Sequence, residues 1–284
     1  MPATLYLVAT PIGNLEDITL RALRILREEV SLIACEDTRR TQKLLEHYGI
    51  KKPLISYHEH NERSRAAEIL KSLHDGKSIA LLSDAGTPLV SDPGYRVATA
   101  AIEAGFPVVP LPGASALLAA LAASGLPVDE FRFVGFLPSK AGARRRALQE
   151  MANDPLTIVA YESPHRVLDT LSDMTEIFGE RPIVAAREIT KIHEEFLRGT
   201  AASIREKLAQ RPSVKGEFTL VIGRSEQKTQ IDDPAAEVLR LQREEGLSRM
   251  DAIKAVAKRM SLPKREVYRL SAEPGNNPPD KRRG

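Results

Sequence analysis

The sequence contains a single cysteine, Cys35, among its 284 residues. One cysteine excludes a disulfide bond within the chain, and its place in an apolar run at 32–35 favours a buried small hydrophobe over a nucleophile. No stretch approaches the roughly 18 uninterrupted apolar residues of a membrane helix. Residues 1–4 lead into a short apolar segment without a basic leader. We therefore expect a cytoplasmic protein without a signal peptide or a membrane span.

The familiar signatures of nucleotide and metal sites are also missing. Neither G-x-G-x-x-G nor G-x-x-x-x-G-K-[ST] occurs, which disfavours a Rossmann dinucleotide site and a P-loop. The triplet His58-Glu59-His60 lacks the i, i+4 spacing of a helical zinc site, and no cysteine or third histidine lies nearby, so we expect no metal. The formal net charge is only +3, which permits a polyanionic partner without requiring one.

Short apolar runs alternate with segments of helical period, which predicts βα units and a mostly parallel sheet over residues 1–124. The expected strands are 5–9, 32–35, 54–57, 79–83 and 108–111. The expected helices are 15–30, 38–48, 62–74, 94–104 and 115–124. Together these segments make one complete α/β domain.

A linker at 125–129, where Gly and Pro break both periods, leads to a second α/β domain over residues 125–224. Its expected strands are 131–136, 157–161, 183–186, 195–198 and 218–222. Its expected helices are 143–151, 164–178 and 202–210. The charged strand at 195–198 and the late strand at 218–222 predict a mixed sheet.

A polar stretch at 225–230 predicts a second linker, and a small helical domain is expected over residues 231–273. Residues 248–251 have the pattern of a capping box, and Pro263 lies near the start of a second helix. Two short helices joined by a tight turn fit either a helix-turn-helix that binds nucleic acid or a helical appendage. Residues 274–284 are expected to form a disordered basic tail.

The loop at 83–94, with the sequence Ser-Asp-Ala-Gly-Thr-Pro-Leu-Val-Ser-Asp-Pro-Gly, is the first candidate site. It follows an expected buried strand and precedes an expected helix, and open α/β sheets bind ligands at such strand ends. Its composition can hold backbone N–H groups and carboxylates beside a ligand. The alternative is a tight surface turn that binds nothing.

Polar loops also follow the other expected strands. Gly13 allows close backbone approach, and the next residue can cap a helix. The segment Glu36-Asp37-Thr38-Arg39-Arg40 can hold a ribose hydroxyl and a phosphate, or it is a capped helix start with solvated Arg side chains. The imidazoles of His58 and His60 suit RNA contact or proton transfer.

Six segments, in this order and at this spacing, resemble the tetrapyrrole-methylase superfamily. They are Thr10-Pro11-Ile12-Gly13-Asn14, Glu36-Asp37-Thr38-Arg39, His58-Glu59-His60-Asn61, Ser83-Asp84-Ala85-Gly86-Thr87-Pro88, Leu111-Pro112-Gly113-Ala114-Ser115 and Tyr161-Glu162-Ser163-Pro164-His165-Arg166. Within the superfamily they are similar to the branch that methylates the ribose 2′-oxygen of a cytidine in 16S rRNA. The resemblance covers residues 4–223 closely and the helical tail more loosely.

The resemblance implies two α/β domains with the methyl donor, S-adenosylmethionine, in the cleft between them. The donor-binding positions that it implies are Pro11, Gly13, Asp84, Ala85, Gly86, Thr87, Pro112, Gly113, Ala114 and Ser115 in the first domain, and Tyr161 and Glu162 in the second. Tetrapyrrole relatives carry a more Gly-rich first loop and a Gly-Asp-Pro central motif, so the departures here favour RNA over a porphyrin-type substrate. The basic segment 140–146 neutralises RNA phosphates in this interpretation, or else forms a solvated helix face.

A sulfonium donor is already activated and needs no metal, so the protein must align the acceptor oxygen and help to remove its proton. The candidates for this role are Glu36, Asp37, Arg39, His58 and Lys191. The expected partners are 16S rRNA or the 30S subunit, and a second copy of the chain in a homodimer. Two alternatives stay open: a tetrapyrrole or corrin small-molecule methyltransferase, and a non-catalytic RNA-binding protein on a methylase scaffold.

Overall fold

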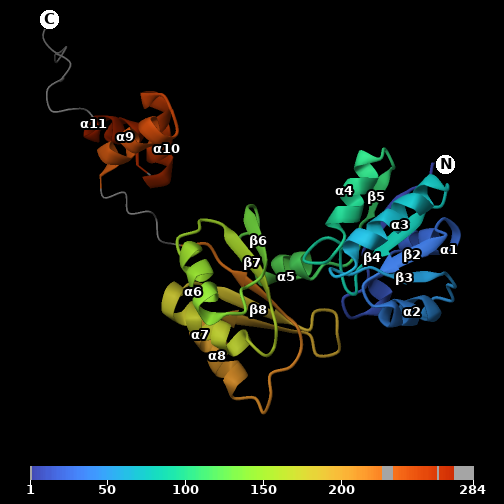
Figure 1. The fold of residues 1–284 in the computed structure, drawn as a ribbon. Helices are drawn as coiled ribbons and strands as arrows, with labels where there is room; N and C mark the ends of the chain where they lie inside the picture. The colour runs from blue at the N-terminus through green and yellow to red at the C-terminus, as the bar shows by residue number, and fades with distance from the viewer. Residues whose placement is uncertain (1, 226–232, 261, 272–284) are drawn as a thin grey trace, which may run out of the picture. The chain divides into compact units, whose positions relative to one another are not determined.

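The computed structural model of the chain describes residues 2–225, 233–260 and 262–271. The chain groups into two compact units, Met1–Arg224 and Ser225–Gly284. The first unit contains two α/β halves, each built around its own five-stranded sheet (Figure 1). Because the residues up to Arg224 cluster as one unit, the domain boundary expected after residue 124 stays a prediction.

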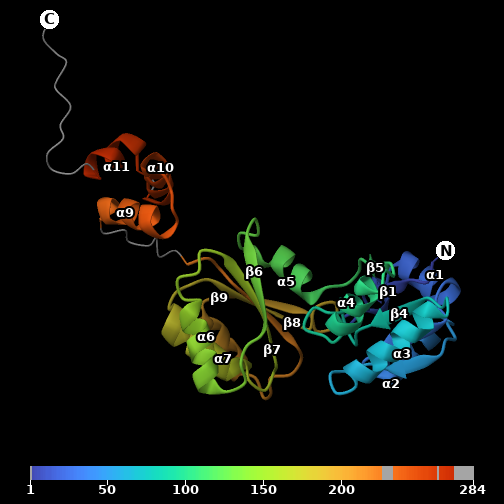
Figure 2. The ribbon, with the colours of Figure 1, turned by 45° about the horizontal axis from the view of Figure 1, so that its top comes forward.

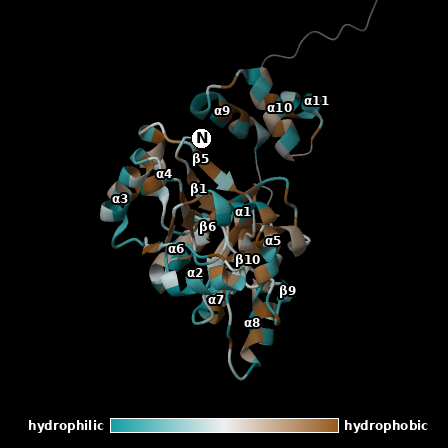
Figure 3. Cartoon of the chain, turned by 90° about the vertical axis from the view of Figure 1, so that its right-hand side faces the viewer, coloured by the Kyte–Doolittle hydropathy of each residue, from teal (hydrophilic) through white to brown (hydrophobic). Residues whose placement is uncertain are grey.

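The first sheet is wholly parallel, in the order β3-β2-β4-β1-β5. Its strands are β1 (Leu5–Val8), β2 (Leu32–Cys35), β3 (Leu54–Ser56), β4 (Ile79–Leu82) and β5 (Val108–Leu111). One face is covered by α1 (Leu20–Glu28) and α2 (Thr38–His47), and the other by α3 (Glu62–His74) and α4 (Tyr95–Glu103). Burial on both faces explains why these strands are almost continuously apolar. Figure 3 shows hydrophobic colour on β1 and β5 and hydrophilic colour on α2.

The second sheet is mixed, as expected, in the order β6-β7-β10-β8-β9 (Figure 2). Its strands are β6 (Phe131–Phe136), β7 (Thr157–Glu162), β8 (Ile183–Arg187), β9 (Glu195–Gly199) and β10 (Phe218–Ile222). Helices α6 (Ala141–Glu150), α7 (Val167–Phe178) and α8 (Ala201–Ala209) cover one face. The opposite face is covered by α5 (Ala116–Ser124), which follows β5 of the first sheet in the chain. Helix α5 therefore connects the two halves.

The single helix expected at 15–30 is wrong, because two caps divide it. The Asn14 side chain accepts a hydrogen bond from the Glu16 N–H over 3.1 Å and starts a 3-10 helix, Leu15–Asp17. The Thr19 hydroxyl accepts from the Ala22 N–H over 3.1 Å and starts α1. Asn and Thr are favoured at such positions because their oxygens satisfy free N–H groups at the start of a helix. The other strands and helices expected in this unit are present, with small differences at their ends.

The basic segment at 140–146 is partly used inside the fold. The Arg144 Nε donates to Asp173 Oδ2 over 2.8 Å, and both side chains are nearly buried between α6 and α7. The Arg145 guanidinium bonds to Asp173 Oδ1 over 2.8 Å and to Glu176 Oε2 over 2.6 Å. Neither a solvated helix face nor an RNA contact therefore describes Arg144. Arg146 is exposed.

The second unit is a bundle of α9 (Pro234–Glu244), α10 (Arg249–Met260) and α11 (Lys264–Leu270) around a shared apolar core. The sequence analysis expected two helices here and missed α9. The Asp233 carboxylate accepts from the Ala235 N–H over 2.8 Å, and Pro234 begins the helix. The linker residues 226–230 and the tail 274–284 lie outside the described residues. Within the described parts of the chain, no helix is long and apolar enough to cross a bilayer.

Candidate active site

The loops that follow β1 and β4 are joined at the carboxyl edge of the first sheet. The Thr10 N–H donates to the Gly86 carbonyl and the Gly86 N–H donates to the Thr10 carbonyl, both over 2.9 Å. The Thr10 hydroxyl also donates to the Ser83 carbonyl over 3.0 Å. These bonds fix the loop at 83–94 at the edge of the sheet where open α/β folds bind ligands.

The second part of this loop has an uncommon backbone conformation. Leu89 and Ser91 have φ angles of 73° and 64°, which are costly for residues with a side chain. At Gly94 the φ angle is 138°, and a Cβ there would lie 2.8 Å from side-chain atoms of Leu81 and Leu89. The chain therefore turns sharply here, and it brings Asp92 to the same cavity as the start of the loop.

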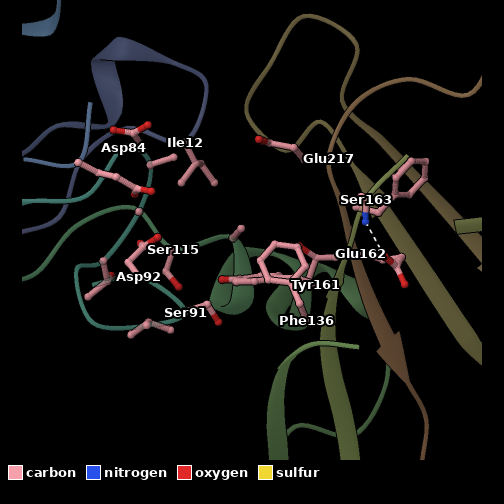
Figure 4. A pocket seen from close by; sticks show the side chains of 18 of the residues that line it. Ile12, Asp84, Ser91, Asp92, Ser115, Phe136, Tyr161, Glu162, Ser163 and Glu217 are labelled. Carbon is pink, nitrogen blue, oxygen red and sulfur yellow. Dashed lines mark hydrogen bonds between the residues drawn. The ribbon is translucent and has the colours of Figure 1, made fainter. Parts of the chain in front are cut away.

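A cavity of about 420 Å³ lies between these loops and the second sheet. Cofactor sites usually measure roughly 300–1,000 Å³. Figure 4 shows side chains of the first half facing those of the second half. From the first half, the lining residues are Ile12, Glu36, Arg40, Asp84, Ala85, Gly86, Thr87, Val90, Ser91, Asp92, Ser115 and Ala116. From the second half, they are Phe136, Tyr161, Glu162, Ser163, Pro164, Glu217, Phe218 and Thr219.

The expected donor-binding residues fall into two groups. Those that line the cavity are Asp84, Ala85, Gly86, Thr87, Ser115, Tyr161 and Glu162. Those in adjoining loops, outside the cavity lining, are Pro11, Gly13, Pro112, Gly113 and Ala114. Pro11 lines a smaller neighbouring cavity of about 150 Å³ that shares Arg40 and Asp84 with the larger one.

Two glycines show how closely the adjoining loops pack. A Cβ on Gly113 would lie 2.8 Å from the Ala9 Cβ, so the loop after β5 presses directly on the end of β1. A Cβ on Gly13 would overlap the Lys191 side chain, which comes from the second half. Both glycines therefore act through backbone spacing, since neither can offer a side chain to a ligand.

Of the expected catalytic residues, Glu36 lines the cavity, whereas Asp37 and Arg39 do not. The Asp37 carboxylate caps α2 by accepting from the Arg39 N–H over 2.8 Å, and it pairs with the Arg39 guanidinium over 2.9 Å. The hydrogen bond from the Arg39 side chain is the main reason that the pKa of Asp37 falls to about 2. Asp37 acts on the cavity through its backbone, because its N–H donates to Asp84 Oδ1 over 2.9 Å.

His58 and Lys191 also lie outside the cavity lining. The His58 Nε2 is 3.1 Å from Asn61 Nδ2, within the turn that starts α3. The Lys191 ammonium donates to Glu188 Oε1 over 2.8 Å and to Glu217 Oε2 over 2.9 Å. Burial lowers the pKa of Lys191, but these two hydrogen bonds outweigh it and leave the pKa above its usual value. Lys191 is therefore a cation at neutral pH and holds Glu217 at the cavity wall.

Two lining residues that the sequence analysis did not select as site residues are Arg40 and Asp92. The Arg40 guanidinium is 3.4 Å from Asp84 Oδ2, whereas its neighbour Arg39 points to Asp37. Burial, followed by the nearby Glu36 and Asp84 carboxylates, raises the pKa of Asp92 to about 7. Burial and Asp84 likewise raise the pKa of Glu36. The sequence signal for Asp92 was its place in the same loop as Asp84, but only the turn brings both to one cavity.

The wall from the second half is aromatic. The Tyr161 ring makes edge contacts with Phe133 at 5.0 Å and with Phe136 at 5.5 Å between centroids. Phe136 is 56% exposed, so one side of its ring is accessible to solvent. Burial raises the pKa of Tyr161, which keeps its hydroxyl protonated at neutral pH.

Glu162 stabilises this wall. Its carboxylate accepts hydrogen bonds from the Ser163 N–H and the Thr170 hydroxyl, both over 2.7 Å, and pairs with Arg166 over 2.8 Å. Figure 4 shows the Glu162 carboxylate directed away from Asp84. Across the described ranges of the chain, no group of three or more His, Cys, Asp or Glu residues is arranged to hold a metal ion.

Residues 4–205 match the family of tetrapyrrole (corrin/porphyrin) methylases. The chain belongs to this family. Two relatives called ribosomal RNA small subunit methyltransferase I are each 47% identical to this methylase over 273 residues. The protein from Halalkalibacterium halodurans aligns with 94% of this chain and 94% of its own. The protein from Synechocystis aligns with 95% of this chain and 97% of its own.

A solved structure with the same fold is uroporphyrin-III C-methyl transferase from Thermus thermophilus, complexed with S-adenyl homocysteine. The TM-score is 0.54 at 21% sequence identity, over 78% of this chain and 97% of that one. The family resemblance, the two α/β sheets and the S-adenosylmethionine-dependent methyltransferase class expected from the sequence are thereby confirmed. The protein is therefore a methyltransferase, and the alternative of a non-catalytic RNA-binding protein is wrong.

Proposed function

We propose that this methylase transfers the methyl group of S-adenosylmethionine to the ribose 2′-oxygen of a cytidine in 16S rRNA of the small ribosomal subunit. The observation that carries the proposal is the 47% identity, over 94% of the chain, to a ribosomal RNA small subunit methyltransferase I. The acidic cavity with an exposed aromatic ring beside it supports the same function. A tetrapyrrole substrate has weaker support, since the solved structures of uroporphyrin-III C-methyltransferase are only about 21% identical to this chain.

The cavity fits the proposed methyl donor in size and chemistry. S-adenosylmethionine carries a positive sulfonium and an ammonium group, and the cavity is lined by the carboxylates of Glu36, Asp84 and Asp92. Such carboxylates also accept hydrogen bonds from ribose hydroxyls. Gly113 packs on Ala9 without room for a side chain, so its backbone would lie against the adenosine part of the donor. When bound, the donor supplies an activated methyl group.

The side of the cavity near Phe136 suits the RNA. Sequence-specific recognition of RNA usually places an unstacked base on an aromatic ring, and the exposed Phe136 ring offers such a surface. The Arg39 and Arg40 side chains are 87% and 65% exposed beside the cavity and can approach a phosphate. We propose that Phe136 stacks on the target base while these arginines bind the backbone.

The proposed work of the protein is alignment, exclusion of water and removal of one proton. The walls from both halves hold the acceptor ribose in line with the methyl group, which converts a bimolecular step into an effectively unimolecular one. Tyr161 and Phe136 exclude water from one side. Of the catalytic residues expected from the sequence, only Glu36 lines the cavity and can touch the reacting groups. Asp37, Arg39 and Lys191 orient the residues that line the cavity.

We also propose that the protein acts in the cytoplasm as a homodimer. The apolar side chains of Leu118 on α5 and Phe131 on β6 are 55% and 39% exposed. β6 is an edge strand of the second sheet, so it offers unpaired backbone groups to a second chain. Light scattering on the purified chain gives the mass, and a monomer at micromolar concentration would contradict this part of the proposal.

The decisive experiment transfers a labelled methyl group from S-adenosylmethionine to 30S subunits and, in parallel, to naked 16S rRNA. We expect one modified nucleotide, mapped to a cytidine whose 2′-oxygen carries the label. Label on a base atom, or no label on either RNA substrate while a precorrin-type substrate is methylated, would overturn the proposal. Calorimetry with S-adenosylmethionine on the same sample checks that the protein used is competent.

A further inference from the structure

Five carboxylates line the cavity, and three of them form an ion pair with a neighbouring side chain. Asp84 accepts from the Asp37 N–H over 2.9 Å and lies 3.4 Å from Arg40. Glu162 pairs with Arg166 over 2.8 Å. Glu217 accepts from Lys191 over 2.9 Å, and so its charge is also balanced.

Glu36 and Asp92 are different, since neither forms an ion pair with a residue that the structure describes. Glu36 still feels the positive charge of Arg40, which partly offsets its burial. Asp92 faces Glu36, which follows β2, and Asp84, which follows β4, and both raise its affinity for a proton. The Ser83 side chain, through a hydrogen bond, is the group that acts in the opposite direction.

Asp92 is also held in place by its backbone. The left-handed residues Leu89 and Ser91 force the turn that carries Asp92 to the cavity, and strained residues of this kind concentrate at active sites. Figure 4 shows Asp92 beside Ser115, on the side of the cavity opposite Tyr161 and Phe136. The Asp92 charge is close enough to Tyr161 to raise the pKa of that hydroxyl.

We infer that Asp92 is the general base that accepts the proton of the ribose 2′-hydroxyl during methyl transfer. This inference rests on the proposed function and names the base that the reaction needs. As the bond between the ribose 2′-oxygen and the methyl carbon forms, the 2′-hydroxyl proton moves to a carboxylate oxygen of Asp92. The bond between the methyl carbon and sulfur breaks, and its electron pair stays on sulfur, which becomes neutral. Asp92 then releases the proton to solvent.

The environment of Asp92 suits this role. A general base works best when its proton affinity is matched to the working pH, because it must be ionised and still basic enough to take a proton. An exposed aspartate is ionised but weakly basic at neutral pH. The burial and the two neighbouring carboxylates of Asp92 remove this disadvantage. Asp37 and Lys191 do not suit this role. The pKa of Asp37 is lowered, so its carboxylate is a weak base, and the pKa of Lys191 is raised, so its amine is already protonated at neutral pH.

The test measures single-turnover methyl transfer to 30S subunits between about pH 5.5 and 9, with S-adenosylmethionine affinity measured by calorimetry. We expect the wild-type rate to rise with pH and to level off above about 7. At saturating S-adenosylmethionine, Asp92→Asn should lose roughly 10²- to 10⁴-fold in rate, together with the rising limb. Asp75→Asn, an exposed aspartate after α3, is the matched control and should leave rate and profile unchanged.

Glu36→Gln provides a second test that does not alter Asp92 itself. Removing this negative neighbour should move the rising limb to lower pH, whatever happens to the maximal rate at saturating donor. The inference is overturned if the rate of methyl transfer by Asp92→Asn is within about threefold of the wild-type rate. It is overturned as well if the rising limb of the pH–rate profile is lost in Glu36→Gln but kept in Asp92→Asn. It is also overturned if the limb does not move in Glu36→Gln. A wild-type protein that binds the donor but methylates no 30S subunit refutes the proposed function itself, which is a distinct result.

Discussion

The Asn14 N–H donates a hydrogen bond to the Thr190 hydroxyl over 3.1 Å. Asn14 lies in the loop after β1, and Thr190 lies in the loop after β8, so this bond joins the two sheets beside the cavity. Gly13 and Lys191 touch at the same place. This hydrogen bond and this packing contact therefore help to hold the two halves together next to the site.

Thr190→Val keeps the shape of the side chain but removes the hydroxyl. Because the bond is exposed and water can replace part of it, we expect the free energy of unfolding to fall by only about 0.5–1 kcal/mol. Donor affinity should fall as well, since the halves are less firmly positioned. Ser72→Ala, which removes a hydroxyl that bonds only within α3, is the control and should change neither quantity. Urea unfolding and calorimetry measure the two effects, and equal behaviour of both variants would contradict the role of this contact.

Gly113→Ala should weaken donor binding by roughly tenfold or more. The added Cβ would lie 2.8 Å from the Ala9 Cβ, and the loop after β5 must then move away from β1. Gly142→Ala is the matched control, because nothing lies within 4 Å of a Cβ at that position in α6. We expect the control to bind the donor normally and to be stabilised by up to about 1 kcal/mol. Calorimetry on both variants would contradict the argument if Gly113→Ala bound as tightly as Gly142→Ala.

Asp92→Asn should stabilise the protein at pH 8 but not at pH 4. The pKa of Asp92 is raised from 3.8 to about 7, so between these values the folded state binds more protons than the unfolded state. Wild-type stability therefore decreases as pH rises through this window, and the neutral Asn avoids that loss. We expect a gain on the order of 1 kcal/mol at pH 8, reduced from the full linkage value because the carboxyl is only partly buried. Unfolding of both proteins at the two pH values measures it, and a pH-independent difference would be inconsistent with this pKa.

Arg144→Ala should lower the free energy of unfolding by about 3 kcal/mol. It leaves the nearly buried Asp173 carboxylate without the more buried of its two arginine partners, which is costly in a low-dielectric environment. Arg145 retains one bond to Asp173 and limits the loss. Arg146→Ala, on the exposed side of the same helix, should change the stability by less than about 0.5 kcal/mol. Chemical denaturation compares the two variants, and similar stabilities would show that the buried pair contributes little.

Phe136→Ala should weaken binding of the RNA substrate and leave the donor affinity within about threefold of wild type. Base stacking on an aromatic ring is worth about 1–3 kcal/mol, so the KM for 30S subunits should rise roughly 5- to 150-fold. Phe136→Tyr keeps the ring and should behave like wild type. An unchanged KM in Phe136→Ala, or an equal loss in both variants, would argue against base stacking at this position.

The first sheet could be predicted closely because strands buried on both faces are short continuous apolar runs with polar loops after them. The division of the helix expected at 15–30 could also have been predicted, since Thr19 is a strong N-cap residue. The same holds for α9, which begins with the Asp233-Pro234 pair that favours a helix start. These were local signals that the hydrophobic period alone did not reveal.

The parts of the site that could not be predicted depend on contacts between distant residues. Lys191 could accept a proton only as a neutral amine, but its hydrogen bonds to Glu188 and to Glu217, which lies 26 residues away, raise its pKa and keep it a cation at neutral pH. Arg39 and Arg40 are equivalent in the sequence, and the direction of α2 decides which of them faces Asp84. Asp92 depends on two left-handed residues that no residue preference indicates.

Helix α5 belongs to the first half by chain order and to the second half by packing. Residues 112–115 are therefore the place where the chain passes from one half to the other, and Ser115 lines the cavity at that place. Any rotation of one half against the other must change backbone angles in this segment. Ser115 therefore belongs both to the connection between the halves and to the cavity wall, so a molecule bound against Ser115 also restrains the one place where the two halves are joined in the chain.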